Sequence, residues 1–124
     1  MEISEREVNG VTILDLDGRL VLEDGVKLFV DRMNALTRQP RKRILINFQR
    51  VTYLDSAGVG AIAWKYVTAR KRDGEVKLLN LQPRSHKVLN TTKLLTVIEN
   101  FESEEQAIAS FVDRPDEESN RIPT

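Results

Sequence analysis

The residues of this chain that could carry chemistry lie at positions 55–60, where DSAGVG separates an apolar run from a helical pattern. A strand that turns into a helix here leaves the first N–H groups of the helix unpaired, in the positive end of the helix dipole. Ser56 can therefore carry a phosphate without disturbing the fold, and Asp55 shapes the turn and can cap the helix. We expect Gly58 and Gly60 to keep the first turn low, so that a large partner can approach Ser56.

Positions 58–63 also fit the outline of the G-x-G-x-x-A dinucleotide fingerprint. The acidic residue that should end the next strand is missing, because Asn80 and Leu81 stand there. Close packing and partner access therefore explain the small residues better. A nucleotide held at the Ser56 helix start remains an alternative, as does a serine that only begins a helix.

No other pattern in the sequence indicates enzymatic catalysis. The single histidine, His86, has no partner at a recognisable spacing, and no G-x-S-x-G elbow is present. The absence of cysteine excludes disulfides, thiolate metal sites and cysteine catalysis. We predict no catalytic residue, no metal and no cofactor, and therefore a binding domain rather than an enzyme.

Length and composition favour one compact domain. The chain has 124 residues, of which 40% are hydrophobic and 31% charged, in the range of folded globular domains. The charged N-terminus is not a signal peptide, and no apolar run approaches the roughly 20 residues of a membrane helix. We expect a cytoplasmic protein that does not bind a membrane.

The chain carries 19 basic and 19 acidic residues, so it lacks the broad positive field that dominates nucleic-acid binding. Local basic clusters occur at 38–43 and 65–72. We interpret them as solvated helix and loop faces and expect no nucleic-acid partner.

The hydrophobic pattern predicts an α/β fold in which a β-hairpin opens a mixed sheet with helices packed against it. Asn9-Gly10 is a strong hairpin turn, and Gly18 is expected to end the second strand. A domain over 1–112 precedes a polar, acidic tail at 113–124. The predicted strands are 3–8, 11–17, 44–48, 76–81 and 96–98. The predicted helices are 22–36, one that starts at Ser56 and is ended by Gly74, 83–89 and 103–111.

Three segments resemble the STAS domain family, in particular its anti-sigma factor antagonists. The resemblance covers almost the whole chain and is strongest at 17–20 (DGRL), 44–48 (ILINF) and 51–60 (VTYLDSAGVG). In the family, the serine after the aspartate is phosphorylated by an anti-sigma factor that is also a serine kinase. The resemblance implies that Ser56 is this phosphoacceptor. The unphosphorylated chain would bind the kinase and free a sigma factor, and a serine phosphatase acting on phospho-Ser56 would restore that state.

Two positions depart from the family pattern. Many antagonists carry a kinase-binding acidic residue where this chain has Val21, and the nearest acids are Glu23 and Asp24. These two are candidate partner contacts. A second serine often follows the first in the family, and here Ala57 leaves Ser56 as the acceptor.

Trp64 and Lys65 complete the candidate partner contacts. Trp64, the only tryptophan, lies off the predicted inner stripe of its helix and should be at least partly exposed. It is either a binding anchor or a cover for the edge of the core. The inner stripe is predicted to consist of Val59, Ile62, Ala63, Tyr66 and Val67.

The same fold also serves as a scaffold subunit of signalling or transporter assemblies. Such a subunit would use the Ser56 face for stacking and would never be phosphorylated. A weak homodimer is a further partner state that the sequence leaves open.

Overall fold

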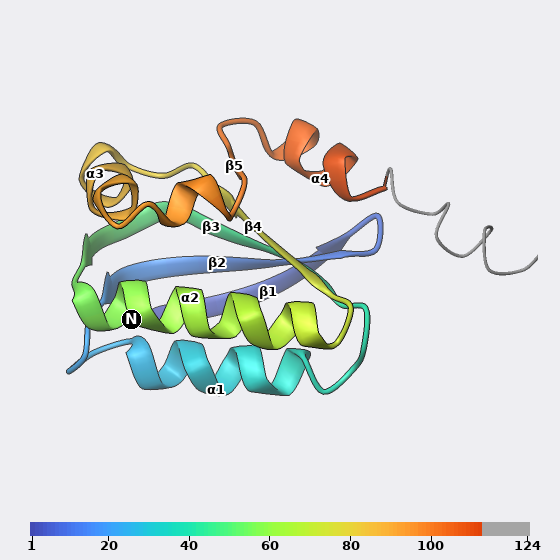
Figure 1. Ribbon diagram of the computed structural model, residues 1–124, viewed down its shortest axis with the longest axis horizontal. Helices are drawn as coiled ribbons and strands as arrows, with labels where there is room; N and C mark the ends of the chain where they lie inside the picture. The colour runs from blue at the N-terminus through green and yellow to red at the C-terminus, as the bar shows by residue number, and fades with distance from the viewer. Residues whose placement is uncertain (113–124) are drawn as a thin grey trace, which may run out of the picture.

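The structure is a computed structural model that describes residues 1–112, so the predicted tail at 113–124 lies outside the described residues. Its elements follow one another along the chain in the order shown in Figure 1. They are β1 (Glu2–Val8), β2 (Val11–Leu20), α1 (Val26–Leu36), β3 (Arg43–Leu54), α2 (Ser56–Lys71), β4 (Glu75–Leu79), α3 (Pro83–Thr91), the 3-10 turn η1 (Leu94–Thr96), β5 (Asn100–Phe101) and α4 (Glu104–Val112).

The strands form one mixed sheet in the order β1-β2-β3-β4-β5. β1 is antiparallel to β2, and the other pairs are parallel. Asn9 and Gly10 join β1 to β2 with φ of 52° and 82°, the left-handed conformation that a tight hairpin turn needs. The predicted α/β fold with an opening hairpin is confirmed.

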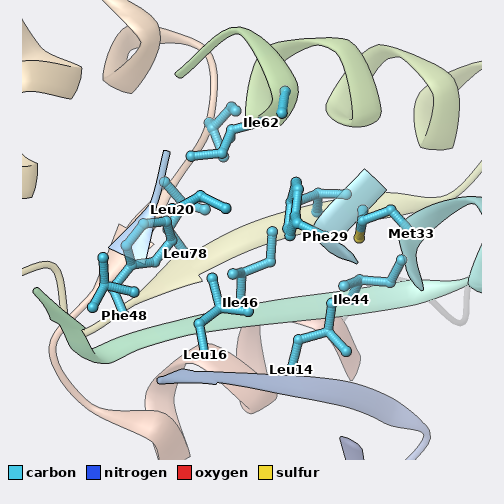
Figure 2. Close-up of a cluster of buried hydrophobic side chains, with 14 of the residues drawn as sticks. Leu14, Leu16, Leu20, Phe29, Met33, Ile44, Ile46, Phe48, Ile62 and Leu78 are labelled. Carbon is cyan, nitrogen blue, oxygen red and sulfur yellow. The ribbon is translucent and has the colours of Figure 1, made fainter. Parts of the chain in front are cut away.

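The topology decides which face of the sheet each helix covers. Crossovers between parallel strands are right-handed, and each crossover here moves one strand in the same direction across the sheet. α1, α2 and α3 therefore cover one face, on which strand residues such as Leu16 and Ile46 meet Phe29 and Ile62 (Figure 2). On the other face, Ile108 and Phe111 of α4 pack on Ile13 of β2.

Two predicted boundaries before the site are wrong. β2 continues through Gly18, which has a φ of 125°, and it ends at Leu20 after a register shift against β3. The predicted start of the first helix at Leu22 is also wrong, because Leu22 is 69% exposed in a loop. Gly25 takes a φ of 100° directly before α1 begins. The loop at 21–25 therefore replaces what had been predicted as the first helical turn.

The predicted strand at 96–98 is wrong as well. Val97 and Ile98 donate their N–H groups to the carbonyl of Leu94, so this segment is a turn of helix. The last strand is instead Asn100–Phe101, paired with β4. The predicted start of the last helix is confirmed, because Gln106 N donates to Ser103 Oγ at 3.2 Å.

Candidate functional site

Asp55 lies between β3 and α2 and joins two segments through its carboxylate. Oδ1 accepts from Gly58 N at 2.9 Å, which caps α2, and Oδ2 accepts from Leu22 N at 3.1 Å. Burial opposes ionisation of this carboxyl, but the hydrogen bonds from backbone N–H groups outweigh it and hold the pKa of Asp55 below its usual value. Asp55 therefore shapes the turn as an anion.

Ser56 is the first residue of α2, and it is exposed. Its hydroxyl makes no hydrogen bond to any residue within the part of the chain that the structure describes. Since Asp55 already caps the helix, the fold does not use the Ser56 hydroxyl, which is open to solvent.

Gly58 and Gly60 differ in their surroundings. Gly58 is buried, and a Cβ there would collide with the carbonyl oxygen of Leu20 and lie 2.7 Å from Leu54 Cδ1. Gly58 thus permits close packing of α2 on the sheet, and the expectation that it keeps the outer surface low is wrong. Gly60 is exposed with nothing within 4 Å of a Cβ, which is the environment expected of a residue that keeps this surface low.

The predicted inner stripe of α2 is wrong in part. Val67 is 47% exposed, and the buried residues of α2 are Gly58, Ala61, Ile62, Lys65 and Ala69. The prediction failed because apolar residues occur on both sides of this helix, so that the 3.6-residue period gives no clear direction.

The outer face of α2 is correspondingly unusual. Ser56, Gly60, Trp64 and Val67 recur at helical spacing and are all exposed, and Trp64 is 58% exposed. No charged residue lies on this face before Arg70, since Lys65 points inward. An uncharged, partly apolar helix face in contact with water is typical of a docking surface.

Lys65 does not lie open to a partner. It is 3% exposed, its Nζ donates to Asn34 Oδ1 at 2.7 Å, and it lies 3.7 Å from the centroid of the Trp64 ring. Burial lowers the pKa of Lys65. The structure thus contradicts Lys65 as a direct contact on the free surface and makes it a support beneath Trp64.

Glu23 and Asp24 lie in the loop at 21–25, which the Asp55 carboxylate ties to the start of α2. Glu23 is exposed, whereas Asp24 Oδ1 accepts from the Met1 amine at 2.9 Å. Sequence reasoning missed the exposed Leu22 in the same loop. Its place in a Leu-Glu-Asp-Gly turn, rather than a helix, was the available signal.

Two findings bear on other kinds of site within residues 1–112. No group of His, Cys, Asp and Glu side chains there could hold a metal ion. No helix in the same range is both long enough and apolar enough to cross a membrane.

The family model described as the STAS domain matches residues 2–107. The chain belongs to the STAS domain family, as the sequence predicted.

Individual relatives agree with this assignment. The chain is 24% identical over 113 residues to an anti-sigma F factor antagonist of Paenibacillus polymyxa, covering 90% of this chain and 95% of that protein. The structure of an anti-sigma factor antagonist of Mycobacterium paratuberculosis superposes with a TM-score of 0.78 at 16% identity, covering 89% and 92% of the two chains. The phosphorylated form of the Bacillus cell fate determinant SpoIIAA gives 0.67 at 23% identity, over 88% and 98%. These structures confirm the fold.

Proposed function

We propose that this chain is an anti-sigma factor antagonist, a cytoplasmic binding module switched by phosphorylation of Ser56. The unphosphorylated chain binds an anti-sigma factor that is also a serine kinase, and phospho-Ser56 releases it. A serine phosphatase returns the chain to its binding state. The observation that carries the proposal is the exposed, unbonded hydroxyl of Ser56 at one end of the uncharged face of α2.

Asp55 caps α2 and Ser56 does not, and this difference supports a switch at Ser56. Asp55 already satisfies the Gly58 N–H at the start of α2, so the fold does not need Ser56 as a cap. A phosphate on Ser56 would add a charge of about −1.5 to −2 to the exposed face of α2, which carries no charged residue before Arg70. Such a charge opposes an apolar partner without requiring the domain to unfold.

The relatives support the class of partner. A relative of nearly the same length is named an anti-sigma F factor antagonist, and SpoIIAA has a phosphorylated form. In this proposal Trp64, Gly60 and the loop at 21–25 contact the kinase, and the domain itself catalyses nothing.

The proposal is tested by incubating the purified chain with ATP and the anti-sigma factor kinase from the same source, followed by intact mass measurement. We expect the mass of one phosphoryl group to be added to wild type and not to Ser56→Ala. Ser4→Ala is the matched control, because Ser4 is also exposed but lies on β1, and it should be phosphorylated like wild type.

Binding should follow the modification. The unphosphorylated chain and Ser56→Ala should bind the kinase, and the phosphorylated chain should not. A chain that an active kinase leaves unmodified, and that forms large assemblies as its concentration rises, would instead be a scaffold subunit. Saturable binding of a nucleotide, lost in Ser56→Ala, would favour the ligand-binding alternative.

A further inference from the structure

The fold joins the two basic clusters that are separate in the sequence. α1 and α2 lie side by side and end at the same end of the molecule, where the chain turns into β3 and β4 (Figure 1). The cationic residues gathered there, which we call the basic end, are Arg38, Arg41, Lys42, Arg43, Arg70, Lys71 and Arg72.

Backbone hydrogen bonds hold the two segments of the basic end together. Arg41 N donates to Arg72 O at 2.8 Å, and Glu75 N donates to Lys42 O at 2.9 Å. The Arg72 side chain adds a bond from Nη2 to Arg38 O at 2.6 Å. The cations therefore lie on two loops that are hydrogen-bonded to each other and keep a fixed arrangement.

Three exposed cations of the basic end, Arg38, Arg70 and Lys71, form neither an ion pair nor a side-chain hydrogen bond within residues 1–112, whereas the Arg72 side chain bonds only to a carbonyl oxygen. Arg6 and Arg32 elsewhere are paired with carboxylates, whereas the exposed Arg19, Lys87 and Lys93 form no ion pair in this range either. The basic end is distinguished by having its cations together at one end of the molecule. The acidic residues within the same two segments are Asp73 and Glu75. A neutral chain thus keeps a local excess of positive charge.

Helix electrostatics explain only part of this excess. Arg70 and Lys71 lie in the last turn of α2, where cations offset the negative end of the helix dipole. Arg38 directly follows Thr37, the C-cap of α1, and is placed for the same interaction, whereas Lys42 and Arg43 lie just before and at the start of β3. The helix dipole therefore does not account for the whole cluster.

The residue types of the basic end indicate the chemical class of its ligand. Most of its cations are arginine, whose planar fork matches phosphate oxygens. None of the exposed large hydrophobic residues within 1–112 belongs to it, so it lacks the apolar core of a protein interface and the inserted side chains of a membrane anchor. A phosphate backbone needs neither, because charge neutralisation supplies the affinity.

Contrary to the expectation from the neutral net charge and the separate clusters, we propose that the basic end binds the phosphate backbone of a nucleic acid without reading its sequence. Binding of this kind has dissociation constants of about 10⁻⁴ to 10⁻⁶ M at physiological salt. The basic end lies about 21 Å from Ser56 along α2, at 1.5 Å per residue. The two surfaces are therefore separate, and this proposal does not depend on the proposed function.

The test uses the full chain and a short fluorescent DNA duplex of mixed sequence, with anisotropy titrations between about 50 and 200 mM salt. The variant Arg38→Gln/Arg70→Gln/Lys71→Gln removes the three unpaired cations. Its control, Arg19→Gln/Lys87→Gln/Lys93→Gln, removes the same charge at exposed positions outside the basic end. Arg38→Lys/Arg70→Lys retains the charge, and thermal unfolding establishes that each variant is folded.

We expect wild type to bind with an affinity that falls steeply with salt. The first triple variant should lose more than tenfold in affinity for the duplex at low salt. The slope of its plot of log K against log salt should be shallower by about 2.7, because each of the three lost phosphate contacts contributes about 0.9. The control triple and Ser56→Asp should stay close to wild type, and the lysine variant, which keeps the charge, should keep its dependence on salt.

Four results would overturn the proposal. They are no duplex binding at low salt, equal loss in both triple variants, tighter binding to phosphatidylglycerol vesicles than to the duplex, and equal competition by polyglutamate. The third would indicate a membrane surface and the fourth an acidic protein segment. If the phosphorylation test fails while duplex binding behaves as expected, only the Ser56 switch is lost.

Discussion

The carboxylate of Asp55 holds the backbone of Leu22, because Asp55 Oδ2 accepts the Leu22 N–H at 3.1 Å while Oδ1 caps α2. One side chain therefore fixes both the loop at 21–25 and the start of the helix that carries Ser56.

Asp55→Ala should lower the free energy of unfolding by about 1 kcal/mol, within the range of about 0.5–2 kcal/mol for the loss of a helix cap. The variant should also expose the Leu22 amide to faster hydrogen exchange, because that N–H loses its acceptor. Urea unfolding and amide exchange measure the two effects. Asp31→Ala, which removes an exposed carboxylate within α1, is the control. An unchanged exchange rate at Leu22 would contradict the role of Asp55 in the loop.

Gly58 and Gly60 form a matched pair of substitutions on one helix. Gly58→Ala should destabilise the fold by about 1–3 kcal/mol, the usual effect of overpacking, because the added methyl meets the Leu20 carbonyl. Gly60→Ala should stabilise it by about 0.5–1 kcal/mol, because alanine is the better helix former and the site is open. Chemical denaturation of both variants measures the difference. Equal effects would mean that the packing of α2 on β2 is looser than described.

Ser56→Asp should abolish kinase binding while leaving the fold unchanged. A negative charge at a helix start contributes about 0.3–1 kcal/mol in its favour, and repulsion from Asp55 opposes it. In the complex the same charge is buried and unpaired, which costs about 2–5 kcal/mol. This corresponds to a loss of affinity of roughly 30- to 3,000-fold, at 1.4 kcal/mol per tenfold.

Paired calorimetric titrations and unfolding curves for wild type, Ser56→Ala and Ser56→Asp separate binding from stability. Ser56→Ala should bind like wild type. If Ser56→Asp also binds like wild type, charge at this position is not the switch.

Arg6 gives the domain a dependence on acid pH, since it links the hairpin to α4. Arg6 Nε lies 2.6 Å from Asp15 Oδ2 and Nη2 lies 2.7 Å from Glu104 Oε1. Burial opposes ionisation of Asp15, but the bonds from Arg6 and Asn47 outweigh it and lower its pKa. The bond from Arg6 lowers the pKa of Glu104.

Because both folded-state pKa values lie below the ordinary values of 3.8 and 4.5, this stabilisation is complete above about pH 4.5 and is lost as the pH falls further. Arg6→Met should lower stability at pH 7 by about 1 kcal/mol, since the pairs are partly exposed, and its difference from wild type should shrink in acid. Urea midpoints from about pH 7 down to pH 3 test this. Lys27→Met, at an exposed pair, should show little change, and an undiminished difference at low pH would contradict the assignment.

The sequence predicted the parts of the fold that local patterns determine. Asn9-Gly10 sets the hairpin, and the alternation of strand and helix patterns sets the α/β class. The end of β2 depends instead on distant residues, because Arg19 and Leu20 pair with Tyr53 and Leu54 of β3. No local pattern shows that pairing, so Gly18 was wrongly expected to end the strand.

In the candidate site, too, local patterns predicted some features, and contacts with distant residues determine the others. The position of Ser56 and the capping by Asp55 follow from a strand that turns into a helix. Whether Gly58 or Lys65 faces inward depends on how α2 lies against β2 and α1. Since α2 carries small or apolar residues on nearly every side, its sequence alone does not fix that rotation.

The agreement between strand order and chain order has a consequence for how the domain forms. Every strand pairs with its predecessor in the chain, so none has to be inserted between two strands that are already joined. Only the β1–β2 pair closes a short loop, whereas each parallel pair must close a crossover that contains a helix, which slows its formation. During synthesis the sheet can therefore grow strand by strand from the β1–β2 hairpin, with β1 as its constant edge and the newest strand as the other edge.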